Sequence, residues 1–386
     1  MVRLPMATAS AAEKTAPVKF GTFGGVFTPN VLTILGVIMF LRTGWVVGNA
    51  GLKQALIILC IANVITLLTS LSLSAVATNI RVKGGGAYFL ISRNLGLEVG
   101  GAIGLPLFLA QAVSVAFYIV GFIESVRFLV PDIPAREVSM GVLAVLLVIS
   151  WVGAGLAVKT QYAILTALGL SLLAFFAGWS PQPGFVERLE PAYVPGHNFW
   201  SVFAIFFPAV TGIMSGVSMS GDLRDPSRSI PKGTILAVLV TWAIYALQMF
   251  WLAWNANRQE LVENTLVMQR ISRVPFLIFV GLWAATLSSA LASLLAAPRT
   301  LQALASDGVV PRWMGRGSGK EKEPKLALVL TAILAGACLL IGELDLIAPI
   351  ISMFFLTTYG TVNLVAGLSG LVSNPSYRPT FKVHWS

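Results

Sequence analysis

The stretch at residues 203–222, FAIFFPAVTGIMSGVSMSGD, is as apolar as a membrane helix but contains residues that interrupt helices. Pro208 lacks a backbone N–H and clashes with the preceding turn, and Gly212 tolerates dihedral angles outside the helical region. An interrupted helix leaves carbonyls that can coordinate a cation and N–H groups that can hold an anion. The stretch therefore predicts an ion site, or else an ordinary proline kink with a tight glycine packing face.

A similar stretch occurs much earlier in the chain. Residues 33–39, TILGVIM, match residues 209–215, AVTGIMS, with Gly36 and Gly212 in equivalent positions 176 residues apart. The first copy lies in the first predicted span and the second in the sixth, five spans further on, so the second copy crosses the membrane in the opposite direction. Glycine-interrupted spans at matching places of two inverted halves indicate a transporter binding site.

These stretches belong to a chain whose composition indicates a multi-pass membrane protein. Of its 386 residues, 56% are apolar and only 11% are charged. Apolar runs of this length predict membrane helices rather than barrel strands. We expect ten spans, at about 27–47, 52–79, 98–129, 137–156, 160–180, 199–220, 233–255, 274–305, 325–342 and 345–373. Residues 1–20 are too weakly apolar to act as a signal peptide, so we expect a polar tail there.

The charge pattern predicts the orientation of the chain. A cytoplasmic N-terminus places most of the 26 Lys and Arg residues in inside loops, as the positive-inside rule requires. We therefore attribute the net charge of +10 to a multi-pass protein of the cell membrane, embedded in the lipid bilayer, and not to a nucleic-acid partner. The sequence contains no catalytic triad, Cys/His pair, metal cluster or cofactor fingerprint, so we expect neither an enzyme nor a cofactor.

Five long blocks of the sequence follow one another along the chain. They are GGVFTPNVLTILGVIMFLRTGWVVGNAG (24–51), ATNIRVKGGGAYFLISR (77–93), SVFAIFFPAVTGIMSGVSMSGDLRDPSRSIPKGT (201–234), ATLSSALASLLAAPRTLQAL (285–304) and ELDLIAPIISMFFLTTYGTVN (343–363). These blocks resemble the cation–chloride cotransporters of the amino acid–polyamine–organocation superfamily. The resemblance is greatest to the sodium–potassium–chloride branch.

The resemblance implies an all-α membrane protein with the LeuT-type fold, in which helices 1 and 6 of two inverted five-helix repeats are broken. On this basis we expect a cytoplasmic tail at 1–20, repeats at 21–180 and 181–373, and a cytoplasmic end at 374–386. The family continues with two more spans and a C-terminal domain that supports dimerisation, so we expect that part to be missing and a homodimer to be possible. The implied function is electroneutral symport of sodium, potassium and chloride by alternating access.

The resemblance also implies three sets of ion-binding residues. The potassium residues are Thr33, Ile34, Tyr118, Pro208 and Thr211. The chloride residues are the backbone amides of Gly36, Val37 and Ile38 at one site, and Gly212, Ile213 and Met214 with the Tyr359 hydroxyl at the other. The sodium residues are Leu32, Leu35, Ala285, Ser288 and Ser289. Thr33 replaces the asparagine usual in this branch, which changes the side-chain contribution to the potassium site.

Several alternatives stay open. The TLSSALAS segment is also typical of a small-residue packing face, and only the resemblance favours sodium binding there. Arg42, late in the first span, could attract chloride or extend to the membrane interface, and Glu124 could attract cations or face water. The rival functions are a sodium–chloride or potassium–chloride symporter, an amino acid permease of the same fold, and a membrane subunit that does not itself transport.

Overall fold

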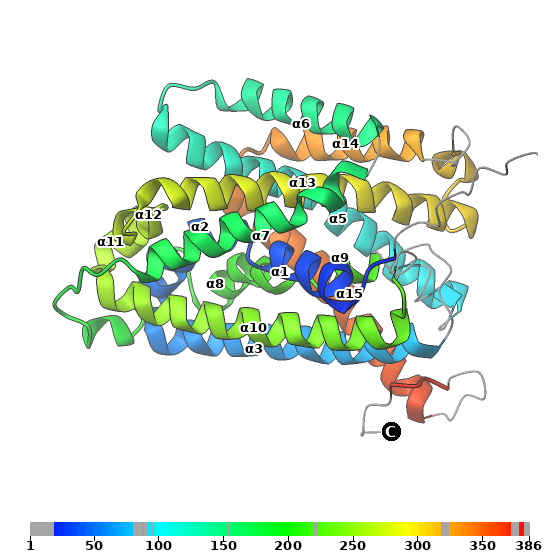
Figure 1. Cartoon of the computed structure of the whole chain (residues 1–386), viewed down its shortest axis with the longest axis horizontal. Coiled ribbons are helices and arrows are strands. Elements are labelled where there is room, and N and C mark those ends of the chain that lie inside the picture. Colours follow the sequence, from blue (N-terminus) through cyan, green and yellow to red (C-terminus); the bar gives the residue numbers. More distant parts are fainter. Residues whose placement is uncertain are drawn as a thin grey trace, which may run out of the picture.

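The computed structural model describes residues 19–79, 88, 92–93, 96–152, 155–218, 223–317, 324–371 and 378–381. Within these ranges the regular structure is helical, and the one pairing of extended residues joins Phe20 to Leu223. The long helices run side by side along the length of the molecule (Figure 1). The prediction of an all-α membrane protein is confirmed. Most of the predicted N-terminal tail and C-terminal end lies outside the described residues.

Seven segments of the described chain are long and apolar enough to cross a membrane. They are Phe23–Leu41, Thr43–Asn79, Leu97–Leu129, Phe199–Ser218, Pro226–Asn255, Pro275–Ser306 and Leu344–Leu371. The other three predicted spans coincide with α6 (Ala135–Val152), α7 (Gly155–Phe176) and α14 (Lys325–Leu339).

Two boundaries differ from the prediction. Helix α3 (Thr43–Asn79) runs from the end of the first predicted span through the second, with a kink at Gly51 in place of a loop. Gly51 has a φ of 64°, and the carbonyl of Glu190 occupies the space that a Cβ would need. Helix α10 (Pro226–Asn255) begins earlier than predicted, because the Asp225 side chain caps its first turn and proline is favoured at the first helical position.

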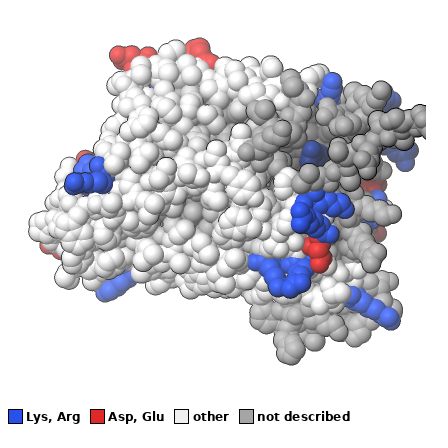
Figure 2. Space-filling view, in the orientation of Figure 1, with Lys and Arg blue, Asp and Glu red and all other residues white. Residues whose placement is uncertain are grey.

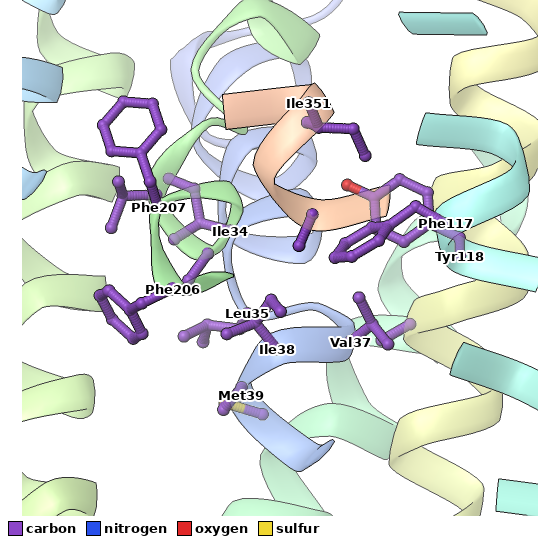
Figure 3. Close-up of a cluster of buried hydrophobic side chains, with 14 of the residues drawn as sticks. Ile34, Leu35, Val37, Ile38, Met39, Phe117, Tyr118, Phe206, Phe207 and Ile351 are labelled. Carbon is purple, nitrogen blue, oxygen red and sulfur yellow. The ribbon is translucent and has the colours of Figure 1, made fainter. Parts of the chain in front are cut away.

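The first span is interrupted, as the sequence predicts. It consists of η1 (Phe23–Phe27), α1 (Thr28–Ile34) and α2 (Val37–Leu41). Between α1 and α2, Leu35 has a ψ of 55° and Gly36 a ψ of −147°, both outside the helical range. In Figure 3 the chain turns at this point, with Phe206 and Phe207 on one side and Phe117 and Tyr118 on the other.

The sixth span is interrupted too. It consists of α8 (Phe199–Phe206), a tighter turn η3 (Phe207–Val210) and α9 (Met214–Ser218). Pro208 lies in the first turn of η3, where its missing N–H and its ring prevent α8 from continuing. The prediction that helices 1 and 6 are broken is confirmed.

Packing places both interruptions in the centre of the bundle. Helix α13 (Pro275–Ser306) packs against α5 (Leu97–Leu129) and α7, while α15 (Leu344–Leu371) packs against α5. Helices α10 and α3 lie along each other (Figure 1). The residues around both breaks belong to the main buried apolar core.

Short segments cover the end of the bundle at the left of Figure 1, where α11 (Arg258–Glu263) and α12 (Val267–Ile271) lie. The loop containing η2 (Glu187–Leu189) is held to this end by the buried Arg188. Its guanidinium donates to the carbonyls of Gln182, Pro183 and Ala253 at 2.6–2.7 Å. The short η5 (Arg312–Gly315) follows α13 at the opposite end.

Candidate ion-binding site

The two interrupted spans lie directly against each other. A Cβ at position 212 would lie 2.8 Å from the backbone nitrogen of Ile34 and 2.9 Å from the Thr33 Cβ, so only glycine fits there without a shift. A Cβ on Gly36 would lie 3.6 Å from the ring of Tyr118. Gly212 therefore allows the close approach of the sixth span to the first, whereas the distance at Gly36 is an ordinary van der Waals contact with α5.

Side-chain bonds join α1 to α9. The hydroxyls of Thr33 and Ser215 are 2.9 Å apart, and the backbone N–H of Gly216 donates to the Asn30 side chain at 2.7 Å. The Asn30 amide also donates to the Thr234 hydroxyl of α10 at 3.3 Å. Since Gly216 lies in the first turn of α9, Asn30 satisfies one of the N–H groups that a helix start leaves unpaired.

The predicted potassium residues gather around these breaks, and two of their carbonyls already accept hydrogen bonds. The Ile34 carbonyl accepts from the Tyr245 hydroxyl at 2.9 Å, and the Pro208 carbonyl accepts from the Thr211 hydroxyl at 2.9 Å. A carbonyl has two lone pairs, so the Ile34 carbonyl can still contact a cation, whereas the Pro208 carbonyl also accepts from the Thr211 backbone N–H at 3.3 Å. Among the described residues the Tyr118 hydroxyl has no hydrogen-bond partner, and Figure 3 shows it pointing away from α5 toward the centre of the bundle.

The predicted chloride amides lie at the starts of short helices. Residues 36–38 begin α2, and residues 212–214 lead into α9, so their N–H groups lie where a helix dipole favours negative charge. The Tyr359 hydroxyl is close by, but it donates to the Thr211 carbonyl at 2.7 Å. A hydroxyl carries one proton, so chloride binding by Tyr359 requires this bond to break.

Three of the five predicted sodium residues line a cavity, namely Leu32, Ser288 and Ser289. Ser288 donates to the Ala285 carbonyl of its own helix at 3.1 Å. The Ser289 hydroxyl is buried and has no partner among the described residues. Leu35, at the break, and the buried Ala285 lie outside the lining.

This cavity, of about 970 Å³, lies between α1, α6, α7, α9 and α13. Along α13 it extends from Trp283 to Arg299, which is about 24 Å of helix. Thr33 of α1 and Ser215 of α9 line it as well. The cavity therefore extends from the half-helices beside the breaks toward the end of the bundle at which α13 finishes.

An ion-pair cluster lies at the end of α2, beyond the break in the first span. Arg42, which is 6% exposed, makes two bonds to the Glu124 carboxylate at 2.8 and 3.0 Å and one to Asp345 at 2.6 Å. The cluster joins the end of α2 to α5 and α15. Neither interpretation of Arg42 from the sequence was right, because two carboxylates neutralise this cation inside the protein.

Sequence reasoning missed four side chains that bond to backbone carbonyls near the breaks. They are Thr66 (to Val210, 3.1 Å), Tyr245 (to Ile34, 2.9 Å), Gln248 (to Met39, 2.7 Å) and Ser352 (to Ala204, 2.6 Å). The sequence could have identified them as polar residues within apolar spans, because such residues face the protein interior and form hydrogen bonds there.

A comparison with protein families decides which family has this architecture. A family model described as amino acid permease matches residues 25–385. The chain belongs to the amino acid permease family. The matched range begins within the first interrupted span and covers both breaks and the residues that line the cavity.

Curated relatives of this chain are named as members of solute carrier family 12. Solute carrier family 12 member 2 of mouse is 38% identical over 97% of this chain and 36% of its own length. Member 8 of mouse is 39% identical over 89% of this chain and 51% of its own length. Member 1 of mouse is 37% identical over 96% of this chain and 40% of its own length. These matches confirm the resemblance to cation–chloride cotransporters.

The chain spans between about a third and a half of the length of these relatives. By name, the family and the relatives are transport proteins, which agrees with the prediction that the chain is not an enzyme.

Proposed function

We propose that this chain forms the transport core of a secondary active symporter that couples sodium, potassium and chloride by alternating access, with no net charge moved. The observation that carries the proposal is the contact between the two interrupted spans at Gly212 and Ile34. Interrupted spans that meet inside a bundle supply unpaired backbone groups for ions of both signs. The solute carrier relatives support transport of inorganic ions.

The proposed location is the cell membrane, and the proposed orientation places the N-terminus in the cytoplasm. On the face shown in Figure 2, Lys and Arg gather mainly at the right-hand end, where Figure 1 marks the C-terminus. The broad middle of this face carries little charge, as a surface in contact with lipid should.

In this orientation the structure corresponds to an inward-facing state. The Arg42 cluster closes the outer side, and the cavity leads from Thr33 and Ser289 toward the cytoplasmic end. Alternating access then requires the Arg42 cluster to separate while α1 and α9 close the cavity. Because α1 is bonded to α9 through Thr33 and Asn30, we expect these two half-helices to move together.

Each ion has a proposed place. Potassium binds between Thr33, the carbonyls of Ile34 and Pro208, and the hydroxyls of Tyr118 and Thr211. Chloride binds at the amides of residues 36–38 and of residues 212–214, the second site with Tyr359. Sodium binds at Ser288, Ser289 and Ala285 with the carbonyls of Leu32 and Leu35. The unpartnered Ser289 hydroxyl supports the sodium site, since a buried polar atom without a partner is costly unless a ligand uses it.

The wider organisation is also a proposal. Residues 21–180 and 181–373 form the two inverted repeats, between a tail at 1–20 and a cytoplasmic end at 374–386. A homodimer is the proposed assembly, and light scattering of the detergent-solubilised chain measures it.

Tracer uptake tests the function. Rubidium, standing in for potassium, is offered to proteoliposomes that contain only this chain, and sodium and chloride are removed in turn. The proposal expects uptake to collapse when either ion is removed. Uptake that needs chloride but ignores sodium indicates a potassium–chloride symporter and removes the sodium site. Competition by amino acids indicates an amino acid permease, and folded protein without uptake indicates a subunit that does not transport.

A further inference from the structure

Helix α10 contacts the first span on both sides of its interruption. The Tyr245 hydroxyl donates to the Ile34 carbonyl at 2.9 Å, and the Gln248 side-chain N–H donates to the Met39 carbonyl at 2.7 Å. Tyr245 and Gln248 are fully buried, and residues three apart project from the same face of a helix. Ile34 ends α1, and Met39 belongs to α2. One continuous helix is therefore bonded to both halves of an interrupted one.

The two bonds depend on the interruption. Ile34 and Met39 are five residues apart, and in an unbroken helix their carbonyls would lie about 140° apart around the axis. Two donors on one face of a neighbouring helix do not reach carbonyls oriented in that way. The non-helical dihedral angles of Leu35 and Gly36 change this orientation, so that both carbonyls meet α10.

The surroundings hold these donors firmly. The Phe206 ring contacts the Tyr245 ring edge to face, with centroids 5.6 Å apart. Gln248 has its side-chain oxygen buried without a partner among the described residues. An apolar side chain would pack there without the cost of that unpaired oxygen, so what the amide adds is its bond to the Met39 carbonyl and a second one to the Met268 Sδ at 2.9 Å.

We infer that Tyr245 and Gln248 are positioning residues that set the separation of α1 and α2, and that Tyr245 also tunes cation preference at the Ile34 carbonyl. The inference rests on the proposed function, in which that carbonyl contacts potassium. The Tyr245 hydroxyl occupies one of its two lone pairs and fixes its direction, leaving the other for the ion. Without the hydroxyl the carbonyl is free to turn, and the site adapts to cations of other sizes.

Two variants and one matched control test this inference. Tyr245→Phe and Gln248→Met remove the two donors. Thr241→Val removes a buried hydroxyl one turn earlier on α10, where it bonds to the Ala237 carbonyl of its own helix at 2.8 Å. Hydrogen exchange of peptides covering residues 31–41 reports on the interruption, and rubidium uptake with caesium and lithium as competitors reports on cation preference.

The inference expects faster exchange across residues 31–41 in both donor variants and wild-type exchange in Thr241→Val. For Tyr245→Phe it also expects a change of about fivefold in the rubidium KM and a shift in the order of competitors, with the chloride KM retained. A change in packing alone would not alter the order of competitors.

The failures can be told apart. If hydrogen exchange across residues 31–41 is as slow in both donor variants as in the wild-type chain, the positioning role is overturned, whatever uptake shows. Faster exchange with an unchanged order of competitors overturns the role of Tyr245 in cation preference. Absence of uptake in the wild-type chain contradicts the proposed function, and exchange alone then decides the positioning role. If Tyr245→Phe does not fold, hydrogen exchange across residues 31–41 in Gln248→Met tests the positioning role.

Discussion

Gly212 lies so close to Ile34 that a Cβ at position 212 would approach the Ile34 backbone nitrogen to 2.8 Å. Gly212→Ala is therefore expected to separate the two breaks, to lower the free energy of unfolding by about 1–3 kcal/mol and to abolish ion uptake. The matched control is Gly169→Ala on α7, where nothing lies within 4 Å of the added carbon. Thermal unfolding and tracer uptake of both variants check this, and equal behaviour of the two would contradict the close contact.

Ser289 tests the sodium site. Its hydroxyl has no partner among the described residues, so Ser289→Ala should leave thermal stability unchanged or slightly higher while raising the sodium concentration for half-maximal uptake about tenfold. Thr286→Val is the control, because the Thr286 hydroxyl bonds to the Leu282 carbonyl of its own helix at 2.7 Å. Sodium titrations of rubidium uptake measure the effect. An unchanged sodium dependence in Ser289→Ala would remove this residue from the site.

Tyr118 tests the potassium site. Tyr118→Phe removes a hydroxyl without a protein partner among the described residues, so the fold should be retained and the rubidium KM should rise about five- to tenfold. The chloride KM should change much less. Tyr162→Phe, at a half-exposed position on α7, controls for the loss of a phenolic hydroxyl. Equal rubidium KM values in the two variants would show that Tyr118 does not contact the cation.

The Arg42 cluster predicts an ordered set of stabilities. Glu124→Gln leaves the buried guanidinium with one carboxylate and should lower the free energy of unfolding by about 1–3 kcal/mol. Asp345→Asn should cost less, since the Asp345 side chain is 43% exposed against 25% for Glu124. Glu190→Gln, which breaks an exposed pair with Lys53, should change stability by less than about 1 kcal/mol. Denaturant unfolding gives the order, and a cost for Glu190→Gln as large as for Glu124→Gln would refute the importance of burial.

Local signals predicted the spans and the two breaks. Apolar length decides which segments cross a membrane, and proline or glycine decides where a helix stops, so residues 33–39 and 207–213 could be identified without a fold. Gly51 was missed, because a glycine in an apolar run is common in membrane helices and its positive φ depends on the neighbouring Glu190 carbonyl.

Partners across the chain could not be predicted in the same way. The Arg42 carboxylates lie 82 and 303 residues away in the sequence, and Tyr245 lies 211 residues from the carbonyl it bonds. Only the packing of α5, α10 and α15 around the first span brings these groups together. The ion assignments themselves, including Thr33 in place of asparagine, remain predictions for the variants above to test.

Coupling is the central claim, and uphill movement tests it most directly. Proteoliposomes hold equal rubidium and chloride inside and outside, with sodium raised outside only, and the membrane potential is clamped at zero. The account predicts that rubidium and chloride both accumulate inside above their external concentrations, and that a different clamped potential leaves the accumulation unchanged. Rubidium that merely stays at its external concentration, or accumulation that follows the clamped potential, would contradict electroneutral symport through the paired breaks.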